Sequence, residues 1–159
     1  MNIIYLALFM ISAATLAFQV ALTRFFALAQ GSHLAFMAIS LALLGAGASG
    51  TYLTLKPASR ANLTPFLSIG AALFSLSVPA SYLIINYLPF DAYRLAWERV
   101  QLLWLALYYL ALAVPFFFGG LVIGAALAAQ PERAGPLYAA SLLGSAVGPV
   151  LALFALATF

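Results

Sequence analysis

The sequence predicts an all-α protein, a polytopic membrane bundle of about five transmembrane helices with a short interfacial helix before the fourth. Of its 159 residues, 67% are hydrophobic and 6% are charged, whereas about a quarter of the residues in a soluble domain are charged. The mean hydropathy of +1.14 gives the same indication. The apolar residues also form long runs, and roughly 20 of them in a helix cross a hydrocarbon core about 30 Å thick.

Five runs reach this length, and charged or helix-breaking residues separate them. We expect spans over 3–22, 33–55, 64–88, 101–129 and 137–159. The stretch 1–159 is then a single transmembrane domain, and we expect no soluble catalytic domain within it. Lys and Arg divide three against three between the two sides, so the positive-inside rule does not orient the bundle.

The first span contains one amide, Gln19, and is expected to end at Thr23 and Arg24. Arg24 at the membrane boundary can extend its long stem and keep its guanidinium in water. Gln19 lies five residues earlier, about 7.5 Å deeper along the helix axis. It could meet Arg24, but it is more readily expected to bond a neighbouring helix, near Ser141 if the first and fifth spans are adjacent.

The second span begins at His33, the only histidine. An imidazole there could ligate a haem or a chlorin, but a polar residue at a helix start is the interpretation that we favour. The chain has no cysteine, which excludes disulfides, thiolate zinc sites and iron–sulfur clusters. We therefore expect no metal site and no cofactor.

The connection after the third span predicts the short interfacial helix. Pro89 ends the span, and Asp91 stands where a helix N-cap would. Over 93–104 apolar and charged residues alternate, and the two tryptophans, Trp97 and Trp104, favour the headgroup level. An extended loop is the alternative.

The fourth and fifth spans contain breakers and small residues. Pro115 removes a backbone hydrogen bond, which predicts a kink in the fourth span. Small residues four apart let helix backbones approach closely in lipid. The glycines expected at such helix contacts are Gly45, Gly50, Gly120, Gly124, Gly144 and Gly148. Their distribution predicts that the second, fourth and fifth spans pack together.

The sequence contains few residues that could carry out catalysis. The three carboxylates, Asp91, Glu98 and Glu132, all lie in connections, which disfavours a proton-coupled transporter with buried acids. The sequence contains no nucleophile–base pair and no phosphate-binding loop. The net charge of +3 is spread thinly, so we expect no nucleic-acid partner.

Five segments in order resemble one family: ISAATLAFQVALTRFFAL, HLAFMAISLALLGAGASG, LPFDAYRLAWERVQLL, VPFFFGGLVIGAAL and GPLYAASLLGSAVG. These are similar to the membrane region of bacterial membrane-bound spermidine-synthase-like proteins, relatives of polyamine aminopropyltransferases. The resemblance covers nearly the whole chain. It implies a multi-span region that precedes a soluble Rossmann-type domain, which binds decarboxylated S-adenosylmethionine or a similar donor and carries the catalytic acid.

Two positions depart from the family pattern. The resemblance implies Glu where this chain has Gln19, and Asp where it has Ser141, after Tyr138 in the fifth motif; Arg24 is retained. One interpretation is that an ion pair or proton site has been lost. The other, which we favour, is that Gln19 bridges two helices.

Three functions are compatible with the sequence. The first is a non-catalytic membrane module that anchors or regulates a soluble or membrane partner. The second is an accessory subunit of a larger membrane complex, for example an energy-transducing one, and the third is a small transporter or lipid-binding protein. The expected partners are the lipid bilayer and another subunit or a separate soluble domain, and the expected location is the bacterial inner membrane.

Overall fold

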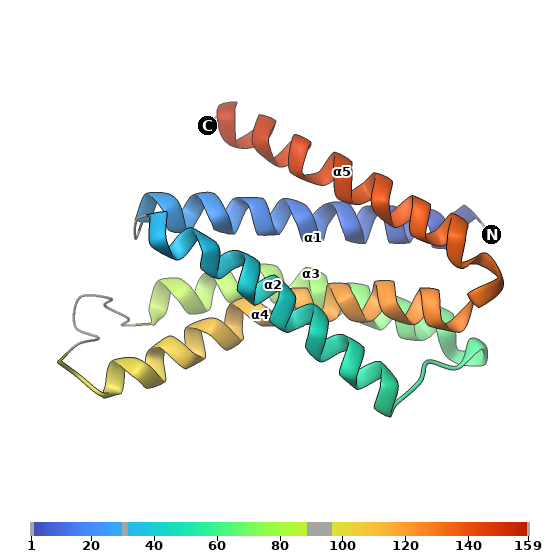
Figure 1. The fold of residues 1–159 in the computed structure, drawn as a ribbon, viewed down its shortest axis with the longest axis horizontal. Coiled ribbons are helices and arrows are strands. Elements are labelled where there is room, and N and C mark those ends of the chain that lie inside the picture. The colour runs from blue at the N-terminus through green and yellow to red at the C-terminus, as the bar shows by residue number, and fades with distance from the viewer. Residues whose placement is uncertain (1, 30–31, 89–96, 159) are drawn as a thin grey trace.

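The fold is a bundle of long antiparallel helices. The computed structural model describes residues 2–29, 32–88 and 97–158 (Figure 1). The helices are α1 (Asn2–Ala29), α2 (Ser32–Leu55), α3 (Leu63–Tyr87), α4 (Val100–Ala129) and α5 (Ala134–Thr158). Each is long and apolar enough to cross a membrane, as expected for an integral membrane protein. The predicted all-α fold class with five spans is therefore confirmed.

The connections are short wherever the structure describes them. A single 3-10 turn, Arg60–Asn62, leads into α3, and another, Pro131–Arg133, leads into α5. The first helix is longer than expected: Thr23 and Arg24 lie inside α1, which continues to Ala29. The expected end at residue 22 was wrong, because a single arginine at a membrane boundary does not break a helix; no glycine or proline occurs before Gly31.

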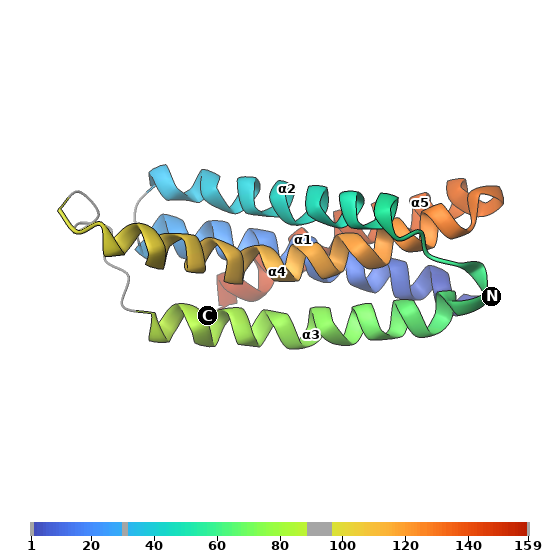
Figure 2. The ribbon, with the colours of Figure 1, turned by 90° about the horizontal axis from the view of Figure 1, so that it is seen from below.

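Helix α4 is the centre of the bundle. Half of its most apolar stretch is buried, against 17–28% for the other four helices. In Figure 2 it lies between α2 and α3, with α1 behind it. Helix α4 continues through Pro115 without interruption, and its two halves run in different directions in Figure 1, as the predicted kink requires.

Two clusters of buried apolar residues form the core. One lies toward the end that contains the N-terminus, where α1, α3, α4 and α5 meet around Leu8, Leu67 and Val122. The other lies toward the opposite end, where α1, α2 and α4 meet around Phe26 and Leu112. Between them these clusters fill the interior along much of its length.

The expected association of α2, α4 and α5 is only partly correct. Helix α2 packs on α4, but α5 packs mainly on α1 (Figure 1) and touches α4 only slightly. Gly144 and Gly148 of α5 do make close contacts, but the backbone that they contact is that of α1. Glycine spacing shows which face of a helix can come close to another helix, and it does not identify the partner.

The predicted interfacial helix, over 93–104, falls partly on residues outside the described part of the chain, since 89–96 are not described. The described residues just before α4, Trp97 to Arg99, form a turn, and the helix from Val100 onward belongs to α4 itself. Trp97 is 87% exposed, while Trp104 is half-buried within α4. An exposed tryptophan at the end of a span is typical of the membrane–water interface.

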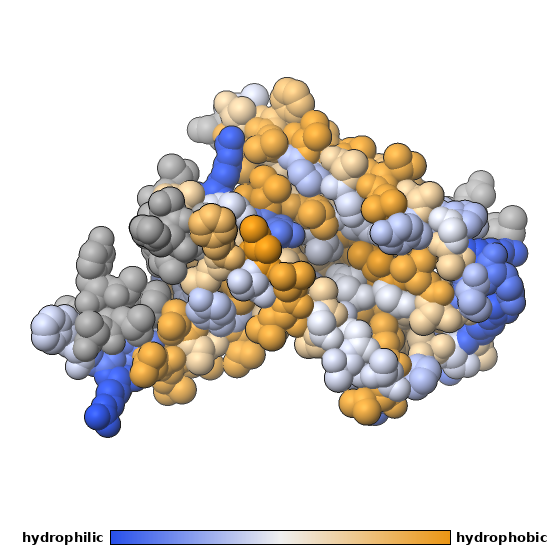
Figure 3. All heavy atoms as spheres, in the orientation of Figure 1, coloured by the Kyte–Doolittle hydropathy of each residue, from blue (hydrophilic) through white to orange (hydrophobic). Residues whose placement is uncertain are grey.

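Charged side chains gather at the ends of the bundle. Figure 3 shows strongly hydrophilic residues massed where the α2–α3 and α4–α5 connections lie, a few at the opposite end, and a mostly apolar flank between them. This distribution is the one expected for a bundle whose flank faces lipid and whose ends face water.

Candidate functional site

The contact between α2 and α4 is built on glycines from both helices. A Cβ added at Gly45 would lie 2.6 Å from the Cβ of Phe116, and one at Gly120 would lie 2.5 Å from the Ser49 hydroxyl. A Cβ at Gly124 would lie 2.8 Å from Leu53. Helices α2 and α4 therefore approach so closely that only glycine, which has no Cβ, fits at these three positions without a shift of neighbouring atoms.

The contact between α1 and α5 is closer still. A Cβ at Gly144 would overlap the backbone carbonyl of Phe9, and one at Gly148 would overlap that of Ala13. Rigid backbone cannot yield as a flexible side chain can, so these are the two positions where a larger residue is least tolerable.

The prediction that Gly50 lies at a helix contact was wrong. A Cβ there would meet nothing within 4 Å, so Gly50 makes no helix contact among the described residues. Five residues from Gly45 place it about 140° away around the helix, which turns it outward. Two other glycines do lie at contacts: Gly119 faces Thr15 of α1, and Gly70 of α3 faces Val122 of α4. Gly70 could have been found as the one glycine in the third span.

Two serine hydroxyls join α1 to α5 in the interior. The Oγ atoms of Ser12 and Ser141 are 2.8 Å apart, and both residues are buried. The first and fifth spans are thus adjacent, as the expectation for Gln19 required. The partner of Ser141, however, is Ser12 and not Gln19.

Gln19 and Arg24 lie on different sides of α1. Gln19 lines a hollow of about 270 Å³ between α1, α2 and α4, together with Thr15 and Gly120. Arg24 faces α5, where its Nη1 lies 3.5 Å from the Leu156 carbonyl oxygen. Five residues along a helix turn a side chain by about 140°, so the two do not meet. Among the described residues, the Gln19 amide has no hydrogen-bond partner.

The remaining predicted residues lie apart from one another. His33 is in the first turn of α2, but its side chain is outside the described part, as is the whole of Asp91. Tyr138 is 55% exposed near the start of α5, and Pro115 is fully buried in the middle of α4. The structure does not bring these residues into one site.

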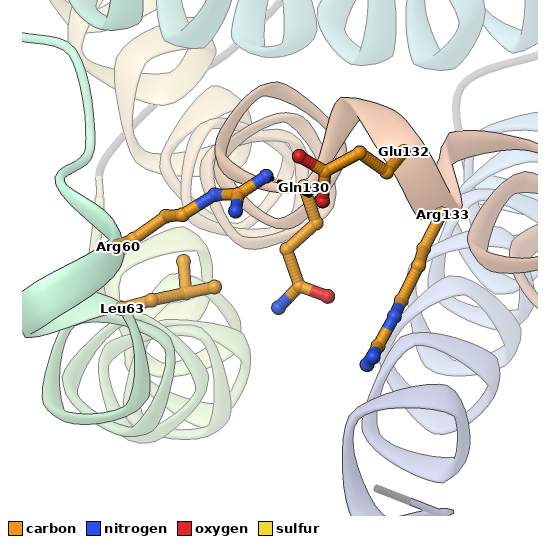
Figure 4. Close-up of a pocket in the computed structure, with 5 residues that line it drawn as sticks. All are labelled: Arg60, Leu63, Gln130, Glu132 and Arg133. Atoms are coloured by element: carbon orange, nitrogen blue, oxygen red, sulfur yellow. Dashed lines mark ion pairs between the residues drawn. The ribbon is translucent and has the colours of Figure 1, made fainter.

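A polar pocket that the sequence did not indicate lies at the end of the bundle (Figure 4). It measures about 290 Å³ and is lined by Arg60, Leu63, Gln130, Glu132 and Arg133. Arg60 Nη2 lies 2.9 Å from a Glu132 carboxylate oxygen, and Arg60 Nε donates to the Ala129 carbonyl, 2.7 Å away, at the end of α4. In Figure 4 Gln130 and Arg133 extend beside this pair.

The chemistry of this pocket is mainly structural. Arg60 satisfies a carbonyl that the end of α4 leaves without a helical partner, and its positive charge complements the helix dipole there. Arg60 and Glu132 are both more than half exposed, so their ion pair contributes little to stability by itself. The pair connects the start of α3 to the start of α5 across the end of α4.

The interior of the described bundle is predominantly apolar. Five hydroxyls inside the spans, those of Thr15, Thr23, Ser49, Ser77 and Ser81, donate to carbonyls of their own helices. Within the described part of the chain, no group of His, Cys, Asp and Glu side chains could hold a metal ion. Bulky apolar residues such as Phe116 and Leu112 fill the space between the helices.

Comparisons with protein-family models, with curated proteins and with solved structures find no match to this chain.

Proposed function

We propose that this chain is a non-catalytic membrane module that anchors or scaffolds a protein partner at the bacterial inner membrane. The observation that carries the proposal is the predominantly apolar interior. The core clusters are apolar, and the buried hydroxyls are bonded within their own helices or to each other. A bundle of this kind holds itself in the bilayer and presents its ends and flanks to other molecules.

The five segments that resemble spermidine-synthase-like proteins support a soluble domain as the partner. In that family the membrane region accompanies an aminopropyltransferase-like domain. The polar end around Arg60 and Glu132, or the opposite end around Trp97, offers a water-facing surface for such a domain.

An accessory subunit of a membrane complex is the alternative. Its partner would lie along the flank and not at an end. A transporter has less support, because it needs a polar route between the two sides, and the described interior is packed with apolar side chains.

Photo-crosslinking in native membranes tests the proposal and separates it from the alternative. A photoreactive phenylalanine analogue replaces one exposed aromatic residue at each end: Tyr138 (55% exposed) or Tyr87 (85% exposed). A third variant places it at Leu43 (70% exposed), in the middle of α2. Mass spectrometry identifies the adducts.

One defined protein adduct at Tyr138 or Tyr87 supports a docking end. An adduct at Leu43 alone favours the accessory subunit. Lipid adducts at all three positions, with no protein adduct, would contradict both.

A further inference from the structure

An apolar groove runs between α1 and α3 near the end that holds the C-terminus of α3. Its volume is about 380 Å³. Helices α1 and α3 make little direct contact with each other, so α4 forms its floor. The groove is lined by Phe18, Ala21, Leu22, Arg24, Phe25, Ser81, Tyr82, Ile85, Leu112 and Leu156.

A second apolar hollow lies on the other side of Arg24. It measures about 370 Å³, and its lining comes from the last turns of α5: Val150, Leu153, Phe154 and Ala157. Arg24 lines both the groove and this hollow. One cation thus stands between two apolar troughs that are open to the surroundings of the bundle.

The charge of Arg24 is not compensated within the described chain. Among residues 2–29, 32–88 and 97–158, its guanidinium has one weak contact, 3.5 Å to the Leu156 carbonyl, and no carboxylate of these residues lies within ion-pair distance. Glu132 is paired with Arg60 at the opposite end of the bundle. An unpaired guanidinium at the edge of the hydrocarbon region is costly, and a phosphate can accept two of its hydrogen bonds at once.

We propose that Arg24 and its two flanking hollows form a binding site for one anionic phospholipid. The headgroup phosphate binds the Arg24 guanidinium, one acyl chain lies in the α1–α3 groove, and the other lies in the hollow against α5. The geometry indicates this occupant. A diacyl lipid has one anionic headgroup between two apolar chains, and the site has one cation, Arg24, between two apolar hollows.

A diacyl phospholipid supplies an anion for Arg24 and one apolar chain for each hollow, whereas an apolar protein helix supplies no anion. This lipid site does not depend on any protein partner, so it and the proposed function can fail separately.

Native mass spectrometry of the full chain in detergent tests the site, with phosphatidylglycerol, phosphatidylcholine and lyso-phosphatidylglycerol as probes. We expect diacyl phosphatidylglycerol to be retained best, because phosphatidylcholine adds a cation to the head and the lyso lipid lacks one chain. Arg24→Gln is expected to weaken retention of phosphatidylglycerol about fivefold, as for the loss of one lipid-facing cation. Arg133→Gln, at the polar end, is the matched control and should bind as the wild type does.

A second variant tests the groove without changing the charge. Ala21→Trp adds bulk to the groove wall while Arg24 stays, and it should reduce the preference for diacyl over lyso lipid. Circular dichroism establishes that each variant is folded. Equal retention of the three lipids by the wild type would overturn the proposal, as would equal losses in Arg24→Gln and Arg133→Gln, or a wild-type lipid preference in folded Ala21→Trp.

Discussion

At the scale of single residues, the polar groups inside the spans are few, and their surroundings differ. The Ser12 and Ser141 hydroxyls bond each other across two helices. The Gln19 amide faces a hollow and has no described partner. Buried polar groups in lipid are expected to be bonded, so these two cases should respond differently to removal.

Removing the serine pair should cost a small, measurable amount of stability. Ser141→Ala and Ser12→Ala are each expected to lower the free energy of unfolding by about 0.6 kcal/mol, with an upper bound near 1.7 kcal/mol. Steric trapping or thermal unfolding in detergent measures the change. In the double variant the loss should be well below the sum of the two, because both remove the same bond. Fully additive losses would show that the hydroxyls do not interact.

Gln19→Leu should be nearly neutral. The amide has no hydrogen bond to lose among the described residues, and leucine suits the half-buried position between α1, α2 and α4. We expect a change below about 1 kcal/mol in the free energy of unfolding. Combining it with Arg24→Gln should give additive effects, since the two side chains face different helices. A coupling above about 0.5 kcal/mol would mean that they meet in the folded protein.

At the scale of helices, the stability of the bundle depends on which face of each helix carries its glycines. Gly144 accepts the Phe9 backbone, whereas Gly50 on α2 faces open space. Sequence spacing placed both at helix contacts, and the three-dimensional arrangement separates them.

Leucine substitutions provide a matched comparison of these two glycines. Gly144→Leu should lower the free energy of unfolding by about 1–3 kcal/mol, because the side chain would force α1 and α5 apart. Gly50→Leu should change it by no more than about 0.5 kcal/mol. Melting temperatures in detergent provide the comparison. Equal destabilisation by both would indicate that Gly50 is covered in the detergent-solubilised protein, by a second copy for example.

At the scale of the whole molecule, the antiparallel path of the chain places alternate connections on opposite sides of a membrane. The α2–α3 and α4–α5 connections share one end of the bundle, and the start of α4, just after Trp97, lies at the other (Figures 1 and 2). Lys and Arg are too evenly divided to say which end faces the cytoplasm.

Single cysteines can test this arrangement, because the chain contains none of its own. Gly135→Cys and Trp97→Cys introduce exposed thiols at the two ends. In sealed vesicles of uniform orientation, an impermeant maleimide should label only one of the two variants, and inverted vesicles should reverse the result. Labelling of both from the same side would mean an even number of spans between the two positions.

Helix number and composition could be read from the sequence, because they depend on local properties. In lipid, a run of about 20 apolar residues forms a helix because a helix satisfies its own backbone hydrogen bonds. Helix-breaking residues such as Pro57, Pro89 and Pro131 mark where one run ends and the next begins. Even so, the end of α1 was misjudged, because Arg24 is a charged residue that a helix can accommodate.

The partners of each helix were decided only by the tertiary structure. In a soluble helix an apolar stripe marks the buried face, but in these spans apolar residues lie on all sides, so inward and lipid-facing surfaces look alike. The packing of α5 on α1, the outward position of Gly50, the pairing of Ser12 with Ser141 and the two hollows beside Arg24 depend on how five such helices fit together. The sequence by itself determined that this chain forms membrane helices, and the packing of those helices determined which side chains meet.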